Sequence, residues 1–112
     1  MKRLAFETLM DSGKVRVLFI QRHPDAIVPE KAQTDSSYLA FDYSKQFSMP
    51  GFKVSDEGIQ AKLSFGGVTE YTFVPWDAVV ALIQNGKVME SWSEGFVIPP
   101  VDKRWLHAVV EA

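Results

Sequence analysis

The chain has 112 residues, with 12 basic and 14 acidic side chains, a net charge of -2 and no cysteine. This length fits one domain with a single core, and the slight acidic excess argues against nucleic-acid binding driven by counterion release. The lack of cysteine excludes disulfides, thiol nucleophiles and cysteine-ligated metals, and we expect a reducing compartment, the cytoplasm.

The N-terminal stretch MKRLAFETLMDSGK predicts a short amphipathic helix rather than a signal peptide or a membrane span. Phe6, Leu9 and Met10 recur at helical spacing, and Gly13 is placed to end the helix in a left-handed conformation. A helix this short needs a surface that buries its apolar stripe. That surface is either the domain's own core or a second copy of the chain.

Short strands are expected through the middle of the chain, where β-branched and aromatic residues are frequent. Residues 14–22 are apolar on both faces and predict a central strand, and residues 26–28 predict a short extended piece in a loop. A further strand is expected over residues 38–43. Residues 52–54 and 59–64 flank the turn sequence SDEG and predict a hairpin.

The second half continues with an alternating strand over residues 68–74 and then the stretch PWDAVVALIQNG. Because proline suits a first helical turn and Gly86 suits a helix end, this stretch predicts a short, largely buried helix. Residues 87–92 predict a last strand. We therefore expect residues 1–92 to form one mainly β (α+β) domain, in which the N-terminal helix precedes a strongly bent antiparallel sheet or partly open barrel with one short helix. Residues 93–112 are expected to form a tail.

The stretch SFGGVTEYTFVPW allows two registers for a hairpin around its two glycines. A two-residue turn mixes polar and apolar side chains on each face, whereas a three-residue loop of Phe65, Gly66 and Gly67 gathers the apolar ones and places Lys62 opposite Glu70. We therefore expect the three-residue loop, which frees the Phe65 ring. Bare backbone beside a free aromatic ring suits the recognition of an extended peptide. The alternative is that Phe65 folds back over the core edge and the glycines only form a turn.

Sequence motifs of enzymes and metal sites are absent. His23 and His107 are far apart and have no cysteine near them, so neither a zinc site nor another cofactor is expected. No phosphate loop, dinucleotide fingerprint or nucleophile elbow occurs. We expect a non-enzymatic protein, because an enzyme would need His23, Asp25 and Glu30 to converge in one deep pocket.

Phe65-Gly66-Gly67, followed by Val74-Pro75, is the most distinctive part of the sequence, and Val28-Pro29 lies upstream of it. These motifs and the order of the elements resemble the stringent starvation protein B (SspB) family over about residues 4–92. The resemblance implies a small Sm-like β domain that dimerises through its N-terminal helix, with a groove for an extended peptide in each subunit. It also implies an adaptor that delivers ssrA-tagged proteins to the ClpX unfoldase of the ClpXP protease for regulated proteolysis. An Sm-like RNA-binding module is the alternative.

The resemblance further implies two sets of functional residues. The peptide groove would be lined by Lys62, Leu63, Ser64, Phe65, Gly66, Gly67, Phe41, Met49 and Phe52. The homodimer interface would be formed by Phe6, Leu9 and Met10.

The C-terminal tail departs from the family pattern, in which a long acidic linker ends in a basic and apolar motif that docks on ClpX. Here only a short segment follows Trp92, and Lys103-Arg104, Leu106 and Val109-Val110 resemble such a motif loosely. The tail is therefore expected to be either a shortened tether or an extension packed on the domain.

Overall fold

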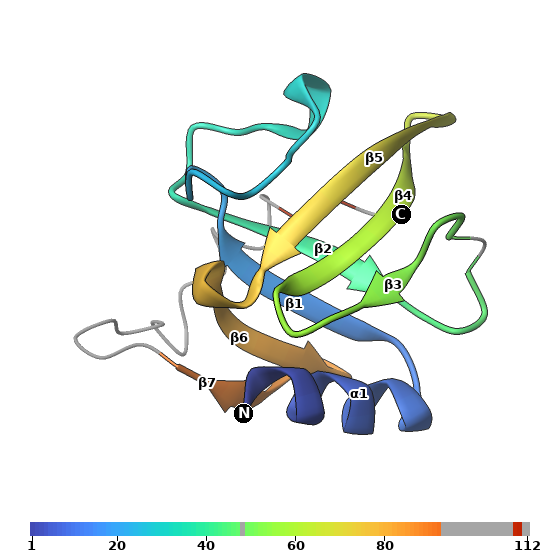
Figure 1. Cartoon of the computed structure of the whole chain (residues 1–112), viewed down its shortest axis with the longest axis vertical. Coiled ribbons are helices and arrows are strands. Elements are labelled where there is room, and N and C mark those ends of the chain that lie inside the picture. Colours follow the sequence, from blue (N-terminus) through green and yellow to red (C-terminus); the bar gives the residue numbers. More distant parts are fainter. Residues whose placement is uncertain (48, 93–108, 111–112) are drawn as a thin grey trace.

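The computed structural model describes residues 1–47, 49–92 and 109–110 (Figure 1). As the sequence indicated, the chain is mainly β, with an N-terminal helix and two sheets that do not close into a barrel. No helix in the described ranges is long and apolar enough to cross a membrane. The elements are α1 (Lys2–Ser12), β1 (Val15–Ile20), η1 (Glu30–Ala32), β2 (Tyr38–Tyr43), β3 (Lys53–Val54), β4 (Gly58–Phe65), β5 (Val68–Pro75), η2 (Trp76–Ala78), β6 (Val79–Gln84), β7 (Lys87–Ser91) and β8 (Val109–Val110).

The larger sheet has the strand order β7-β6-β1-β2-β8, and the smaller one has the order β3-β4-β5. All neighbours pair antiparallel except β8, which runs parallel to β2. Figure 1 shows the β4–β5 hairpin crossing over β1 and β2, with α1 at the end of the molecule near β6. The central strand predicted from the apolar residues on both faces is β1, which pairs with β2 on one side and β6 on the other.

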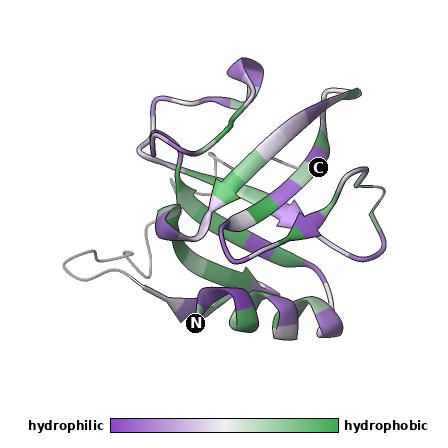
Figure 2. Ribbon diagram, viewed as in Figure 1, coloured by the Kyte–Doolittle hydropathy of each residue, from purple (hydrophilic) through white to green (hydrophobic). Residues whose placement is uncertain are grey.

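The main core lies between the two sheets and under α1, because the inward residues of β1, β2, β4, β5 and β6 belong to one buried cluster. Figure 2 shows hydrophobic residues along β1 and β6 and hydrophilic ones on the outer loops. A second, smaller cluster includes Leu18, Ala40 and Val80, which alternate with the inward-facing residues of their strands. The larger sheet therefore buries apolar side chains on both faces.

Helix α1 packs on the chain's own core rather than offering its stripe to a second copy. Phe6 is fully buried with its ring 5.6 Å from that of Tyr43 and 5.9 Å from that of Trp76, and Met10 is buried as well. Of the predicted dimer residues, only Leu9 is partly exposed. The expectation that Phe6 and Met10 form an intersubunit surface is therefore wrong, because the domain's own sheets already bury them.

Polar contacts fix α1 at both ends. Lys2 Nζ donates to the carbonyl oxygens of Trp76 at 2.8 Å and Val79 at 2.9 Å, and burial lowers the pKa of this amine. At the other end, Gln84 Nε2 donates to the Leu9 carbonyl at 2.9 Å. Gly13 ends the helix with φ 154° and ψ -164°, a positive-φ conformation that favours glycine but is not the left-handed helical conformation we expected.

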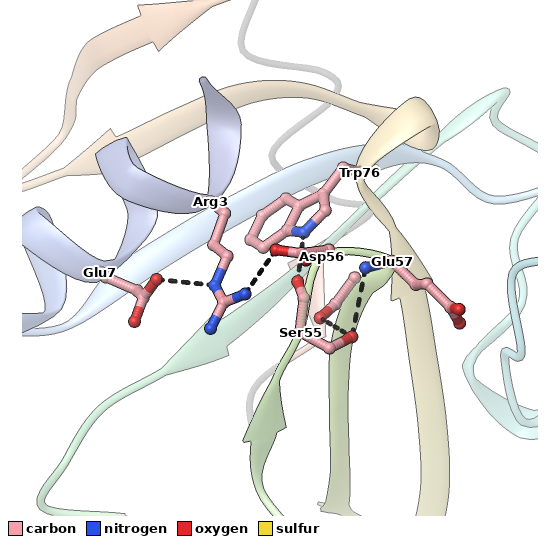
Figure 3. A network of polar contacts seen from close by, with 7 residues as sticks. Arg3, Glu7, Ser55, Asp56, Glu57 and Trp76 are labelled. Atoms are coloured by element: carbon pink, nitrogen blue, oxygen red, sulfur yellow. Dashed lines mark hydrogen bonds and ion pairs between the residues drawn. The ribbon is translucent and has the colours of Figure 1, made fainter.

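A network at the side of α1 ties the helix to the β3–β4 turn (Figure 3). Arg3 donates to Glu7 at 2.9 Å and to Asp56 at 2.6 Å. The turn is held in place by Trp76, whose indole N–H donates to the Ser55 carbonyl at 2.8 Å. These contacts orient the helix over the buried face of the sheets.

The predicted helix after Pro75 is wrong. The chain makes only the 3-10 turn η2 before it enters β6, a strand whose residues are all buried. The β-branched residues Val79, Val80 and Ile83 favour an extended backbone, and a strand buried on both faces reads as a continuous apolar run. Burial on both sides, rather than helical periodicity, explains the unbroken apolar stretch.

The β4–β5 hairpin has the two-residue turn, so the predicted three-residue loop is wrong. Phe65 pairs with Val68, and Lys62 lies opposite Tyr71 rather than Glu70. The φ angles of the two glycines are 60° and 85°. A type I′ turn needs positive φ at both central positions, and its twist matches that of the flanking strands.

Hydrophobic patterning alone disfavours the two-residue turn, because its register places the polar residues Thr72 and Glu70 opposite the inward-facing Ala61 and Leu63. The structure compensates Thr72, whose hydroxyl donates to the Ala61 carbonyl at 2.8 Å. Glu70 is only partly buried and lies 3.6 Å from Lys31, although its Oε2 atom has no hydrogen-bond partner among the described residues. A hydrogen-bonded polar group can be buried at little net cost, so Thr72 is compatible with the two-residue turn.

Tyr43→Phe is expected to stabilise the protein. The Tyr43 side chain is fully buried, and its hydroxyl has no hydrogen-bond partner among the described residues. Removing an unpaired buried hydroxyl should raise the free energy of unfolding by about 1 kcal/mol. Burial, with a smaller contribution from Asp42, also raises the pKa of Tyr43 above its ordinary value of 10.0. The folded chain therefore retains the phenol proton at a pH where the unfolded chain loses it.

Below pH 10.0 the stabilisation by the retained proton is fully present. Above that pH, the free energy of unfolding falls by about 1.4 kcal/mol per pH unit, because the unfolded chain loses the phenol proton and the folded chain keeps it. Urea unfolding at about pH 8 and about pH 11 measures this loss. The Phe variant should lose less stability than the parent between the two conditions. Equal losses of stability in the parent and the Phe variant would contradict the raised pKa of Tyr43.

Candidate functional site

The Phe65 ring is not free at the hairpin tip, because it packs into the core. Phe65 is 5% exposed, and its ring centroid lies 5.7 Å from that of Phe41, which lies 5.0 Å from that of Phe19. This row of aromatic rings joins β1, β2 and β4 across the space between the two sheets. The alternative noted from the sequence, a Phe folded back over the core edge, describes the structure. Leu63 is buried in the same cluster.

The other predicted residues of the hairpin lie on its outer surface or at its tip. Lys62, Gly66 and Gly67 are exposed, and Ser64 is partly exposed. A Cβ atom added at either glycine would meet no atom within 4 Å. The tip therefore presents bare backbone next to the edge where Phe65 enters the core.

Met49 and Phe52 lie in the loop between β2 and β3, and the structure places Phe52 beside α1 rather than beside the glycines. Phe52 borders a hollow of about 200 Å³ whose walls include Phe6 and Met10, and its ring centroid is 6.3 Å from that of Tyr43. Met49 packs partly against the main core. The residues predicted to line one peptide groove therefore lie in separate places, because Phe52 borders the hollow under α1 and the glycines lie at the hairpin tip.

The feature that the sequence did not indicate is the outer edge of β2. Val109 lies opposite Ala40 and Val110 lies opposite Phe41 in a parallel pairing, so this edge holds an extended segment of the chain. The paired position Phe41 is also the residue that contacts Phe65. An extended backbone therefore sits on β2 next to the aromatic contact that leads to the two glycines.

The adjoining residue of β2, Asp42, helps to hold this edge in place. Asp42 is nearly buried, and Arg16 on β1 binds it with two hydrogen bonds, from Nε at 2.7 Å and from Nη2 at 3.0 Å. Lys14 Nζ lies 3.8 Å from the same carboxylate. A bidentate arginine fork fixes geometry as well as charge, so this contact ties β2 to β1 near the C-terminal end of β2.

A second sheet edge, that of β5, also accepts an extended segment. The Ile27 N–H donates to the Phe73 carbonyl at 2.9 Å, and the Phe73 N–H donates back to the Ile27 carbonyl at 3.1 Å. This is the short extended piece predicted over residues 26–28. Both edges therefore hold a segment of the chain itself, and the β2 edge is the one that lies beside the Phe41–Phe65 contact.

The end of the molecule near β3 and β5 carries acidic hollows. The larger, about 490 Å³, is lined by Asp25, Asp56, Glu57 and Asp77 together with Phe73, Pro75 and Trp76. The neighbouring one, about 350 Å³, shares Asp56, Glu57 and Phe73 with it. Of the three residues considered for an enzyme, Asp25 lines the larger hollow, whereas His23 and Glu30 do not. His107 lies outside the described residues, and within them no group of three or more potential metal ligands comes together.

No protein-family model matches the chain, and a search of curated proteins found no match either.

Phe65→Ala is expected to destabilise the domain, because it removes a buried ring from the aromatic row. The cost should be about 3–5 kcal/mol of unfolding free energy. Val68→Ala is the matched control, since Val68 is the pairing partner of Phe65 but is half exposed, and it should cost less than about 1 kcal/mol. Urea unfolding of the two variants provides the comparison. A Phe65 variant as stable as the Val68 variant would show that the ring is not part of the core.

Proposed function

We propose that this protein is a non-enzymatic adaptor that binds degradation-tag peptides of the ssrA type in an extended conformation and delivers tagged proteins to the ClpXP protease. The observation that carries the proposal is the β2 edge beside the Phe41–Phe65 contact, which holds an extended segment of the chain itself. The resemblance of the glycine hairpin and its flanking motifs to the SspB family supplies the class of peptide and the protease.

Recognition at this edge would rest on main-chain hydrogen bonds. A peptide that adds a strand to an exposed sheet edge gains affinity from backbone pairing and selectivity from the pockets beside it. Strand β2 is six residues long and pairs with β1 at all six positions, so its geometry is already fixed before a peptide arrives. A preorganised edge reduces the conformational entropy lost on binding.

The neighbouring hairpin favours close approach of a second backbone. Gly66 and Gly67 have no side chains, and space around them is open. Lys62 is exposed and Ser64 is partly exposed on the face of β4 that turns away from the core. We keep these four residues as candidates for contact with a bound peptide, a role that the resemblance implies, whereas Phe65, Leu63 and Phe41 are buried.

Delivery to a protease requires tethering and no catalytic group. An adaptor that holds a tagged protein near ClpX raises the effective concentration of the tag, and a dimer with two sites would increase this effect. Because Phe6 and Met10 are buried, a dimer formed through α1 would have to use the outer side of the helix, where Leu4 is exposed.

The alternative, an RNA-binding module, receives less support from the described surface. Four carboxylates line the larger hollow near β5, and they would repel a phosphate backbone.

Backbone methylation of the peptide tests the mode of binding. Successive N–H groups of a strand point to opposite sides, so only one alternate set of peptide amides can face β2. Two labelled ssrA-derived peptides, N-methylated on one alternate set or on the other, are titrated against the full chain by fluorescence anisotropy. One isomer should bind at least about tenfold more weakly than the unmodified peptide, because each lost main-chain hydrogen bond is worth about 1 kcal/mol.

The second isomer is the internal control and should bind within about threefold of the unmodified peptide. If both isomers bind as the parent does, the peptide does not pair with a strand. If the unmodified peptide does not bind even at high micromolar concentration, the proposed function is wrong.

Delivery is tested separately with a fluorescent protein that carries an ssrA-type tag. Adding the full chain should lower the KM of ClpXP for this substrate with little change in kcat, because tethering increases encounter without changing the unfolding step. An untagged copy of the same fluorescent protein is the control. Peptide binding without any effect on KM would reduce the protein to a binding module.

A further inference from the structure

We infer that the C-terminal strand β8 is a built-in competitor that occupies the peptide-binding edge of β2 until a peptide displaces it. This inference rests on the proposed function, because it assigns a regulator to the same edge. It concerns only Val109–Val110 and the strand on which they lie.

Occupancy of the edge by β8 and by a peptide is mutually exclusive. A strand offers one row of outward N–H and C=O groups along each edge. The inner edge of β2 pairs with β1 along its whole length, so the outer edge is the only one open to an added strand. At Ala40 and Phe41 this outer edge is already paired with β8. A peptide that reaches the position next to the Phe41–Phe65 contact must therefore remove β8.

The pairing of β8 is short enough to be displaced. It spans two residues, whereas β2 provides six. A peptide in a fully extended conformation can pair beyond Ala40 and Phe41, toward Asp42 and Tyr43 or toward Leu39. Parallel pairing is also slightly less stable per residue than antiparallel pairing. A longer strand can therefore replace β8 and gain contacts that β8 does not make.

The attachment of β8 to the domain makes the competition independent of protein concentration. A covalently linked segment acts at a fixed effective concentration, set by the length of the connecting chain. If the edge is free in only a fraction of molecules, the apparent dissociation constant of a peptide rises by the inverse of that fraction. If the pairing of β8 is worth no more than about one net main-chain hydrogen bond, the edge is free in at least about one tenth of the molecules.

Variants of the full chain test the competition. Val109→Pro combined with Val110→Pro removes both backbone N–H groups and prevents β pairing. Val109→Thr combined with Val110→Thr is the matched control, because threonine keeps the N–H group and the β-branched shape. The labelled ssrA-derived peptide should bind the double proline variant about two- to tenfold more tightly than the parent. It should bind the double threonine variant and the parent alike.

Displacement is measured directly in the parent protein by NMR. Without peptide, the amides of Val109 and Val110 should show the chemical shifts of an extended strand and cross-strand contacts to Ala40 and Phe41. As the ssrA-derived peptide is added, these contacts should vanish in proportion to binding, and the two amides should move to the shifts of an unstructured chain. This readout does not depend on the fold of any variant.

The outcomes separate the two proposals. If the peptide binds the parent and the double proline variant equally, or binds while the contacts of β8 persist, the inference is overturned and the proposed function stands. If the peptide binds neither protein, the proposed function fails and the inference fails with it, because the vacated edge is then no peptide site. Tighter binding to the proline variant together with release of β8 supports both.

Discussion

The contact between Phe41 and Phe65 connects the two sheets beside the outer edge of β2. Phe41 belongs to the strand whose outer edge holds β8, and Phe65 belongs to the last position of β4 before the glycine turn. Both rings are buried, so they pack the end of β4 against β2. The aromatic row from Phe19 to Phe65 thus connects the base of the glycine turn, the shared core and β2 through close packing.

Most of the fold was predictable because local patterns agree with tertiary burial. The helix before Gly13, the strand over residues 38–43 and the hairpin around SDEG have the expected type and nearly the expected bounds. The strand β6 after Pro75 was not predictable, since an apolar run without alternation fits a buried helix and a strand buried on both faces equally well. The hairpin register failed for another reason. The hydrogen bond from Thr72 to Ala61 makes a polar inward residue acceptable, and patterning does not contain that information.

The exposure of Gly66 and Gly67 at a hairpin tip was predictable because two glycines between alternating strands mark a tight turn. Whether these residues bind a peptide stays a prediction. The β2 edge was missed because main-chain groups leave no side-chain signal, and because the pairing of Val109–Val110 with Ala40 and Phe41 joins residues far apart in sequence. Similarly, burial of Phe6 in the chain's own core depends on Trp76 and Tyr43, which lie in distant parts of the chain.

The pairing of β8 also bears on the solubility of the molecule. An uncovered strand edge is a template on which strands of other copies can add, leading to aggregation. At the opposite edge of the same sheet, β7 is exposed along its length and contains Lys87 and Glu90, charges that oppose such addition. At the outer edge of β2, Val109–Val110 pair with Ala40 and Phe41. Strand β8 therefore leaves fewer unpaired main-chain groups on this edge to which a strand of another copy could add.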